Sequence, residues 1–273
     1  MPNSRSSNKA LRLWQLLLFA AVMLFWYAAT SPTLLPPIYF DDPNKAAFFF
    51  GEPLKVVDRV WDWFSSGSIY PHLWVTLVET ALAFTVGTVL GLLMGLWLAL
   101  SPIASALLDP YIKALNSMPR VILAPIFGVW FGLDIASKVA LGVTLVFFIV
   151  FFNVYQGVRE VSHTVLANAR ILGASERQLL RHVYVPSAMS WVFASLHNSV
   201  GLAFVGAVVG EYLGSSRGVG YLILQAEGTF DINAVFAGIV VLTGFALLLD
   251  WAVSLAERRL LVWQPRSGET EKI

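Results

Sequence analysis

Long apolar blocks separated by short polar segments dominate the chain. A helix that crosses a bilayer needs about 20 apolar residues, and several blocks approach or exceed that length: Leu11–Ala29, Leu73–Leu100, Val139–Phe152 with its flanks, Ala188–Gly210 and Ala234–Leu249. A shorter stretch with prolines, from Pro119 to Ile135, is a sixth candidate. Barrel strands would be about 10 residues long and would alternate. The pattern therefore predicts an all-α polytopic membrane protein with six transmembrane helices.

The composition agrees with a surface that mostly faces lipid. The 273 residues are 57% hydrophobic and 13% charged, whereas soluble domains are about 25% charged. The net charge of +1 gives no general attraction to nucleic acid, so no nucleic-acid partner is expected. The chain has no cysteine, which excludes disulfides, thiolate nucleophiles and cysteine-based metal sites.

The distribution of basic residues predicts the orientation. Cytoplasmic segments of membrane proteins are enriched in lysine and arginine. With six spans and both termini in the cytoplasm, 13 of the 18 basic residues lie inside. The first apolar block could instead be a signal peptide, but it is longer than the usual apolar core of about 7–15 residues. A retained helix is therefore the preferred interpretation.

These spans divide the chain into four parts. Residues 1–31 hold the cytoplasmic N-terminus and first helix, 32–71 a periplasmic loop, 72–256 a five-helix core, and 257–273 a cytoplasmic tail. In the loop, Glu52–Phe64 has the pattern of an amphipathic helix. Such a helix lies on the membrane surface or packs against the bundle, and both interpretations remain open.

Glycines recur along the second predicted span. Gly87, Gly91 and Gly95 are four residues apart, and small residues at this spacing let helices approach closely in a membrane. Helix packing is the preferred interpretation. The third span contains prolines, which membrane helices tolerate where neighbours compensate the lost hydrogen bond. It is expected inside the bundle, either beside a pathway or as a packing kink.

Polar residues at membrane depth usually face the bundle interior or a water-filled cavity. On this basis, and with the two prolines, the candidate translocation-pathway residues are Glu79, Pro119, Pro125, Ser195, Asn198, Ser199 and Glu211. For Glu79 an interhelical hydrogen bond is the alternative, and for Glu211 a structural role near the span end. His197 is interpreted as a satisfied buried histidine.

The internal loop 157–187 carries signals of two short helices. Gly173 is a predicted C-cap, and Ser175 with Gln178 forms a capping box that starts the second helix. Pro186 then allows the next span to begin. A projection of this kind on the cytoplasmic face suits docking to a soluble partner, or it caps the bundle.

This loop resembles the cytoplasmic EAA loop of permease subunits of bacterial ABC importers. Its pattern is Glu-Ala-Ala, three residues, Gly, nine residues, Ile, any residue, Leu-Pro. Ala167-Asn168-Ala169, Gly173 and Val183-Tyr184-Val185-Pro186 stand at the matching positions. Ala167 and Asn168 depart from the pattern, which puts a polar contact by residue 167 in doubt.

The resemblance extends from about Leu11 to Trp263 and is nearest to the nitrate, taurine and alkanesulfonate subgroup. Its third span resembles the segment Ser117-Met-Pro119-Arg120, Ala124-Pro125 and Trp130-Phe131-Gly132. The end of its fifth span resembles Glu211 with Arg217-Gly218-Val219-Gly220.

The resemblance implies a type I (MetI-like) core of five helices plus one N-terminal helix. It implies a homodimer in the bacterial inner membrane, two copies of an ATP-binding cassette ATPase, a periplasmic or lipid-anchored substrate-binding protein, and a small organic or inorganic anion as substrate. The residues it places in the contact with the ATPase are Ala167, Asn168, Ala169, Arg170, Gly173, Ala174, Ser175 and Pro186.

No catalytic motif occurs in the sequence. Gly-x4-Gly-Lys-Ser/Thr, His-Glu-x-x-His and Gly-x-Ser-x-Gly are all absent, so ATP hydrolysis is expected on another chain, and no cofactor or metal is expected. The runner-up is a stand-alone secondary transporter or channel with Glu79 or Asp250 as a proton site. Secondary transporters often carry internal repeats, and none is detected. A membrane enzyme is the least favoured class.

Overall fold

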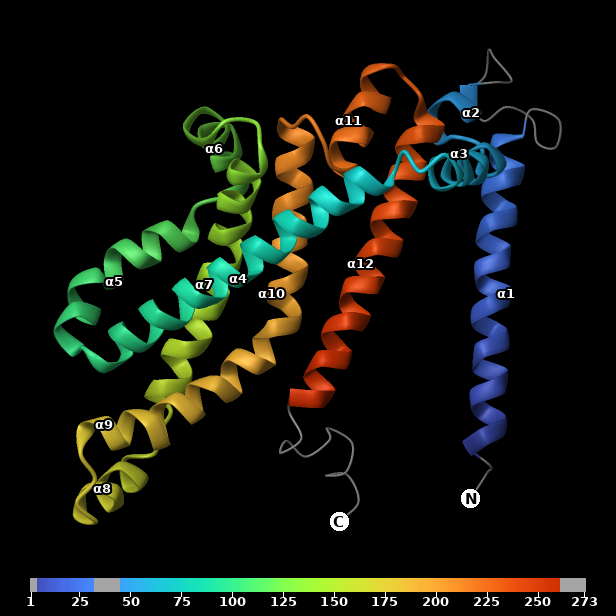
Figure 1. The fold of residues 1–273 in the computed structure, drawn as a ribbon. Coiled ribbons are helices and arrows are strands. Elements are labelled where there is room, and N and C mark those ends of the chain that lie inside the picture. Colours follow the sequence, from blue (N-terminus) through green and yellow to red (C-terminus); the bar gives the residue numbers. More distant parts are fainter. Residues whose placement is uncertain (1–3, 32–44, 261–273) are drawn as a thin grey trace. The chain divides into compact units, whose positions relative to one another are not determined.

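The computed structural model describes residues 4–31 and 45–260, without the side chains of 4–10, 188–190, 192–195 and 256–260. The described residues form helices joined by short turns (Figure 1). The helices are α1 (Ser4–Thr30), α2 (Lys45–Phe50), α3 (Pro53–Ser65), α4 (Tyr70–Leu100), α5 (Pro102–Ser117), η1 (Arg120–Leu123), α6 (Ala124–Phe131), α7 (Ile135–Arg159), α8 (His163–Ile171), α9 (Glu176–Leu179), η2 (Leu180–Tyr184), α10 (Val185–Leu213), α11 (Val219–Gly228) and α12 (Ile232–Leu260).

The prediction of an all-helical membrane protein is confirmed at this level. By length and apolar composition, four helices in the described residues can cross a membrane: α1, α4, α7 and α12. The count rises to five if α5 and the η1–α6 segment, which are bent by 88° relative to each other, form one broken span. The predicted count of six and the orientation of the termini stay predictions.

The third predicted span differs from the structure. Residues 119–135 are not one helix, because helix α6 is only eight residues long and ends at Gly132, whose φ is +80°. Pro119 lacks an N–H and disfavours helical geometry in the preceding residue, and Met118 is accordingly extended at φ −74° and ψ 135°. Pro119 and Gly132 therefore bound this segment, while Pro125 lies in the first turn of α6.

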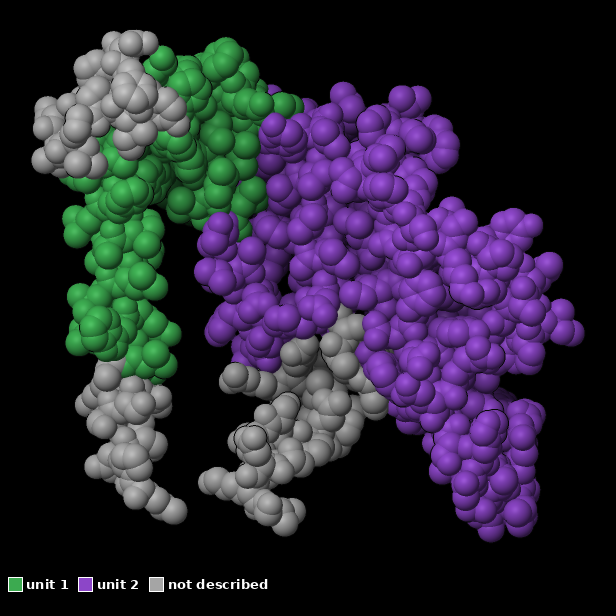
Figure 2. Space-filling model, turned by 180° about the vertical axis from the view of Figure 1, so that it is seen from behind, with its two compact units in different colours: residues 1–70, 222–242 green, residues 71–221, 243–273 purple. Residues whose placement is uncertain are grey.

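The chain divides into two compact units (Figure 2). Unit 1 holds residues 1–70 and 222–242. In it, Arg59 of α3 pairs with Asp231 at 2.7 Å. The expected amphipathic helix is present as α3, with Val56 buried and Trp61 72% exposed. One face of α3 thus packs within unit 1, and its place on a membrane surface stays a prediction.

Unit 2 holds residues 71–221 and 243–273, and its core is the contact of α4, α7 and α10. The glycines of α4 are buried against α7. A Cβ atom on Gly87, Gly91 or Gly95 would come within 2.9 Å of a side chain or backbone atom of α7. Helix α10 approaches α7 as closely, since a Cβ on Gly206 of α10 would lie 2.5 Å from the Gly142 Cα. The predicted packing role of the glycine stripe is confirmed.

Candidate functional site

Two short helices, α8 and α9, project from one end of the unit 2 helices (Figure 1). Helix α8 ends as the glycine signal predicts, with Gly173 at φ +83°. Two backbone hydrogen bonds close the turn, from the Ala174 N–H to the Ala169 carbonyl and from the Gly173 N–H to the Arg170 carbonyl, each 3.0 Å. This pair of bonds is the Schellman arrangement, so the turn between the helices has a defined geometry.

The predicted capping box starts α9. Gln178 Oε1 accepts from the Ser175 N–H at 2.8 Å, and Ser175 Oγ accepts from the Gln178 N–H at 3.4 Å. The turn is also bridged by Arg170, whose guanidinium lies 3.3 Å from the Glu176 carboxylate. Both ends of the turn are therefore tied by side chains that the local sequence supplies.

Pro186 stands in the first turn of α10, at the position predicted for the start of the next span. The sequence did not indicate that α9 runs through the π-helical segment Leu180–Tyr184 directly into α10. Proline removes one backbone hydrogen bond and crowds the carbonyl four residues earlier. A wider π turn relieves that crowding, and such turns often mark functional sites. The projection is thus mechanically continuous with α10.

The tip of the projection is apolar. Ile171 and Leu172 are 82% and 86% exposed, at the end of α8 and outside the candidate membrane spans. The family-implied residues around them are accessible: Ala167, Asn168, Arg170, Gly173, Ser175 and Pro186 are exposed, and Ala169 and Ala174 are half-buried. Behind the projection lies a cavity of about 690 Å³ that includes Arg159, Arg170 and Arg177 in its lining.

A second polar cluster surrounds Glu211, near the C-terminal end of α10. Its side chain is fully buried. One carboxylate oxygen accepts from the Thr76 hydroxyl at 2.6 Å, and the other from the Gly220 N–H at 2.8 Å. A Cβ on Gly218, which has φ +109°, would overlap the Glu211 carboxyl group. The glycine turn that follows α10 therefore wraps around this carboxylate.

Two more ionisable residues lie buried beside Glu211. Glu79 of α4 is 1% exposed and interacts electrostatically with Glu211 and with Lys138 of α7. Lys138, also 1% exposed, donates hydrogen bonds to the carbonyls of Leu133 and Asp134 at the start of α7. The cluster joins α4, α7 and α10 at one end of the bundle.

The remaining pathway candidates are dispersed. Pro119, Pro125 and Asn198 are exposed, and Ser199 is buried. Pro125 lines a cavity of about 200 Å³ beside α7 and the end of α10. The side chain of Ser195 lies outside the described residues. The structure thus brings Glu79 and Glu211 together and does not join them with Asn198.

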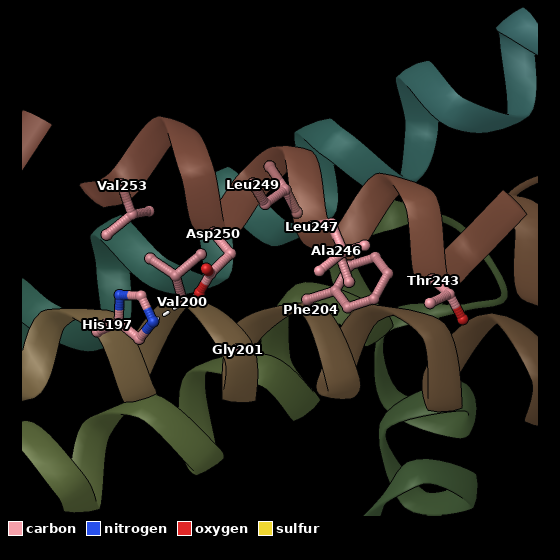
Figure 3. Close-up of a pocket in the computed structure, with 10 residues that line it drawn as sticks. All are labelled: His197, Val200, Gly201, Phe204, Thr243, Ala246, Leu247, Leu249, Asp250 and Val253. Atoms are coloured by element: carbon pink, nitrogen blue, oxygen red, sulfur yellow. Dashed lines mark ion pairs between the residues drawn. The ribbon is translucent and has the colours of Figure 1, made fainter. Parts of the chain in front are cut away.

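His197 and Asp250 form a pair that the sequence did not indicate. The prediction that His197 is buried is wrong, since its side chain is 43% exposed, and its Nε2 lies 2.5 Å from Oδ1 of Asp250 on α12. The two line a groove of about 270 Å³ between α10 and α12, otherwise apolar apart from Thr243 (Figure 3). The two residues are 53 positions apart, so no local pattern signals the contact.

Three features stand out among the described residues. No group of three or more His, Asp or Glu side chains that could hold a metal occurs in the part of the chain that the structure describes. The three features are a projection with a defined turn, a buried ionisable cluster, and a groove with a histidine–aspartate pair.

Comparison with known proteins identifies a family of transport components, and the similar proteins are named as transport permeases. Residues 87–262 match the model of the binding-protein-dependent transport system inner membrane component. A putative aliphatic sulfonates transport permease protein, SsuC of Bacillus subtilis (strain 168), is 35% identical over 212 residues, which cover 78% of this chain and 77% of that protein. The formylaminopyrimidine transport permease protein ThiX of Halalkalibacterium halodurans is 32% identical, covering 92% and 95%.

Solved structures show the same fold. A structure of the MetNI methionine ABC transporter in inward-facing conformations aligns with a TM-score of 0.58 and 20% identity, and the match covers 69% of this chain and 94% of the MetNI chain. At this identity the likeness shows the fold alone. The expected MetI-like fold is therefore confirmed.

Proposed function

The chain belongs to the family of binding-protein-dependent transport system inner membrane components, and from that premise we propose that it carries a small organic anion of the sulfonate class across the inner membrane. It is the multi-pass permease subunit of an ABC importer, and its role is transport, not catalysis. ATP hydrolysis takes place on a partner ATPase, and an external binding protein delivers the solute.

The observation that carries the proposal is the α8–α9 projection. A pair of apolar side chains exposed on a rigid turn is unfavourable in water, because burying each releases roughly 1.5–3 kcal/mol. Ile171 and Leu172 occupy such a turn. An ATPase groove that receives them would gain this free energy. Because α9 continues into α10, movement of the ATPase would be transmitted directly to a membrane helix.

The complete arrangement we propose has two permease copies and two ATPase copies. Both termini lie in the cytoplasm, and α10 and the bent α5–α6 segment complete the six spans. A single chain with six spans supplies half of a pathway, so a second copy of the same chain supplies the other half. The α8–α9 projection then faces the cytoplasm together with the basic residues of the inner loops.

The pathway is proposed along the exposed side of α10. Asn198 is exposed at mid-helix, and an amide is poorly accommodated against lipid. Pro119 and Pro125 belong to the broken α5–α6 segment, where irregular backbone is tolerated only against protein or water. Glu79 and Glu211 are assigned instead to the buried cluster that shapes the outer end of the bundle.

The proposal of a sulfonate as the solute rests on the relatives, because SsuC is named as a putative permease for aliphatic sulfonates. ThiX is named for formylaminopyrimidine, so the permease fold itself accommodates different small solutes. Selection of the solute is assigned mainly to the binding protein, and the permease contributes a pathway that admits small anions.

The experiment that tests this function is co-purification and uptake. The permease would be expressed with its ATPase and binding protein, and Ile171 and Leu172 would be replaced together by serine. We expect the variant to insert normally but to lose both the ATPase and ATP-driven uptake of an alkanesulfonate. A matched control replaces Val165, which is 49% exposed on the same helix, by serine. Equal retention of the ATPase by wild type and the double variant would refute the docking role.

A further inference from the structure

The groove between α10 and α12 has one polar site in an apolar wall. From α10 it is lined by His197, Val200, Gly201 and Phe204, and from α12 by residues that include Ala246, Leu247 and Asp250. Figure 3 shows the His197 ring with one nitrogen facing Asp250 and the other turned away. The polar pair therefore sits at one place in a mainly hydrophobic trough.

One member of this pair belongs to a candidate membrane span. Asp250 lies within the apolar segment Ile232–Leu255 of α12, yet its side chain is 54% exposed in the single chain, and that of His197 is 43% exposed. Ionisable side chains in membrane helices rarely face lipid, and they mark solute and ion pathways. The exposed pair thus indicates that this face of α10 and α12 borders water or a bound solute.

We propose that the groove is a solute-binding site of the transport pathway, in which His197, oriented by Asp250, binds the head group of an organic sulfonate while the apolar wall holds its alkyl chain. The inference rests on the proposed function and goes beyond it by naming residues and the part of the solute that each one contacts.

The chemistry of the pair suits an anionic head group. An imidazolium carries two N–H donors and a carboxylate two acceptor oxygens, and the ion pair uses one of each. In the protonated ring, Nε2 donates to Asp250, and the Nδ1–H on the side turned away can donate to a sulfonate oxygen. When the imidazolium is paired with Asp250, the two charges cancel. The site then binds an anion through directed hydrogen bonds, and no net positive charge slows its release.

The apolar lining of the groove suits a solute with a short alkyl chain. Val200, Phe204 and Leu247 present carbon surface, which favours a solute with an alkyl segment over sulfate, whose atoms are all polar. The volume of about 270 Å³ lies just under the roughly 300–1,000 Å³ typical of drug-sized ligands. A solute with a short alkyl chain is therefore the best-matched occupant.

The absence of cysteine makes a direct test possible. A Cβ on Gly201, in the groove, or on Gly244, on α12 outside its lining, would meet no atom within 4 Å. Gly201→Cys and Gly244→Cys are therefore matched variants. Each would be prepared in the complete importer in proteoliposomes and treated with the membrane-impermeant thiol reagent 2-sulfonatoethyl methanethiosulfonate, in the presence of hexanesulfonate or of sulfate.

We expect Gly201→Cys to react faster than Gly244→Cys, hexanesulfonate to slow that reaction, and sulfate at the same concentration to leave it unchanged. Equal reactivity of the two cysteines would overturn the proposal, and so would a reaction at Gly201→Cys that hexanesulfonate does not slow. If either variant fails to assemble, Val200→Cys and Leu248→Cys give the same comparison.

Uptake separates this inference from the function on which it rests. His197→Ala removes the donor, and we expect the sulfonate concentration needed for half-maximal ATP-driven uptake to rise about tenfold, the effect of one charge-assisted hydrogen bond. His197→Gln, which keeps an N–H donor, should lose less. Unchanged uptake by His197→Ala would overturn the inference alone, whereas wild-type complexes without ATP-driven sulfonate uptake would overturn the proposed function.

Discussion

The Thr76 hydroxyl donates a hydrogen bond of 2.6 Å to the Glu211 carboxylate, and both side chains are fully buried. The same hydroxyl accepts from the Val219 N–H at 3.2 Å. One small side chain on α4 thus holds the end of α10 and the glycine turn after it. Such a buried contact is costly to break, because the carboxylate loses a partner that no water replaces.

The first prediction follows from this contact. Thr76→Val keeps the shape of the side chain and removes the hydroxyl, so it leaves Glu211 and Val219 each short of a partner. We expect a loss of about 1–3 kcal/mol in stability, measured as a lower thermal unfolding temperature of the purified complex. Thr76→Ser, which retains the hydroxyl, is the control and should stay close to wild type. Equal unfolding temperatures for Thr76→Val and wild type would show that these two hydrogen bonds do not stabilise the complex.

The second prediction concerns the contact of α4 with α7. A Cβ on Gly91 would lie 2.8 Å from the Phe147 carbonyl oxygen, an atom of the backbone that cannot move aside alone. Gly91→Ala should therefore push the helices apart and destabilise the unit by about 1–3 kcal/mol. Gly244→Ala is the matched control, since its Cβ meets no atom within 4 Å. A Gly91→Ala protein as stable as Gly244→Ala would refute close packing at this position.

The third prediction concerns Asn198, the exposed amide at mid-helix in α10. Asn198→Leu removes a polar contact from the proposed pathway and should lower the uptake rate. Assembly with the ATPase and basal ATP hydrolysis should stay at wild-type levels, because the residue is remote in sequence from the α8–α9 turn. Transport at the wild-type rate would instead assign Asn198 to a structural or lipid-facing position.

The fourth prediction concerns topology. With six spans and both termini inside, a reporter enzyme fused after Ile273 should be active only in the cytoplasm. A second fusion, within the loop 214–218 between α10 and α11, should report the external side. A reporter after Ile273 that is active outside would contradict the cytoplasmic C-terminus and the count of six spans.

Features determined by neighbouring residues were predictable from the sequence. The Gly173 turn and the Ser175–Gln178 box depend on a few consecutive residues, and both are present in the structure. The packing role of the α4 glycines was equally predictable, because residues four apart share one face of a helix. Its partner helix, α7, was not identified, since periodicity shows which face packs but not against what.

Features determined by tertiary packing were not predictable. His197 and Asp250 meet only because α10 lies beside α12. The sequence suggested a span over Pro119–Ile135, whereas the structure has a helical segment Arg120–Phe131 that is bent by 88° relative to α5. The π turn before α10, which joins α9 to α10 as one continuous helix, was likewise not indicated by the sequence.

The central claim is that the α8–α9 turn couples this permease to a partner ATPase. Gly173 has φ +83°, and a Cβ there would meet no atom within 4 Å. Within the chain, substitution therefore acts through backbone strain, which costs a β-branched residue on the order of 1–2 kcal/mol. Asn tolerates the left-handed region better than most residues, so Gly173→Asn is the control for Gly173→Val.

The most direct measurement is ATP-driven sulfonate uptake together with ATPase co-purification, on the same preparations of wild type, Gly173→Asn and Gly173→Val. The account predicts that Gly173→Val inserts in the membrane but loses the ATPase and uptake in parallel, while Gly173→Asn largely keeps both. A stable Gly173→Val protein that retains the ATPase and transports at the wild-type rate would contradict the account.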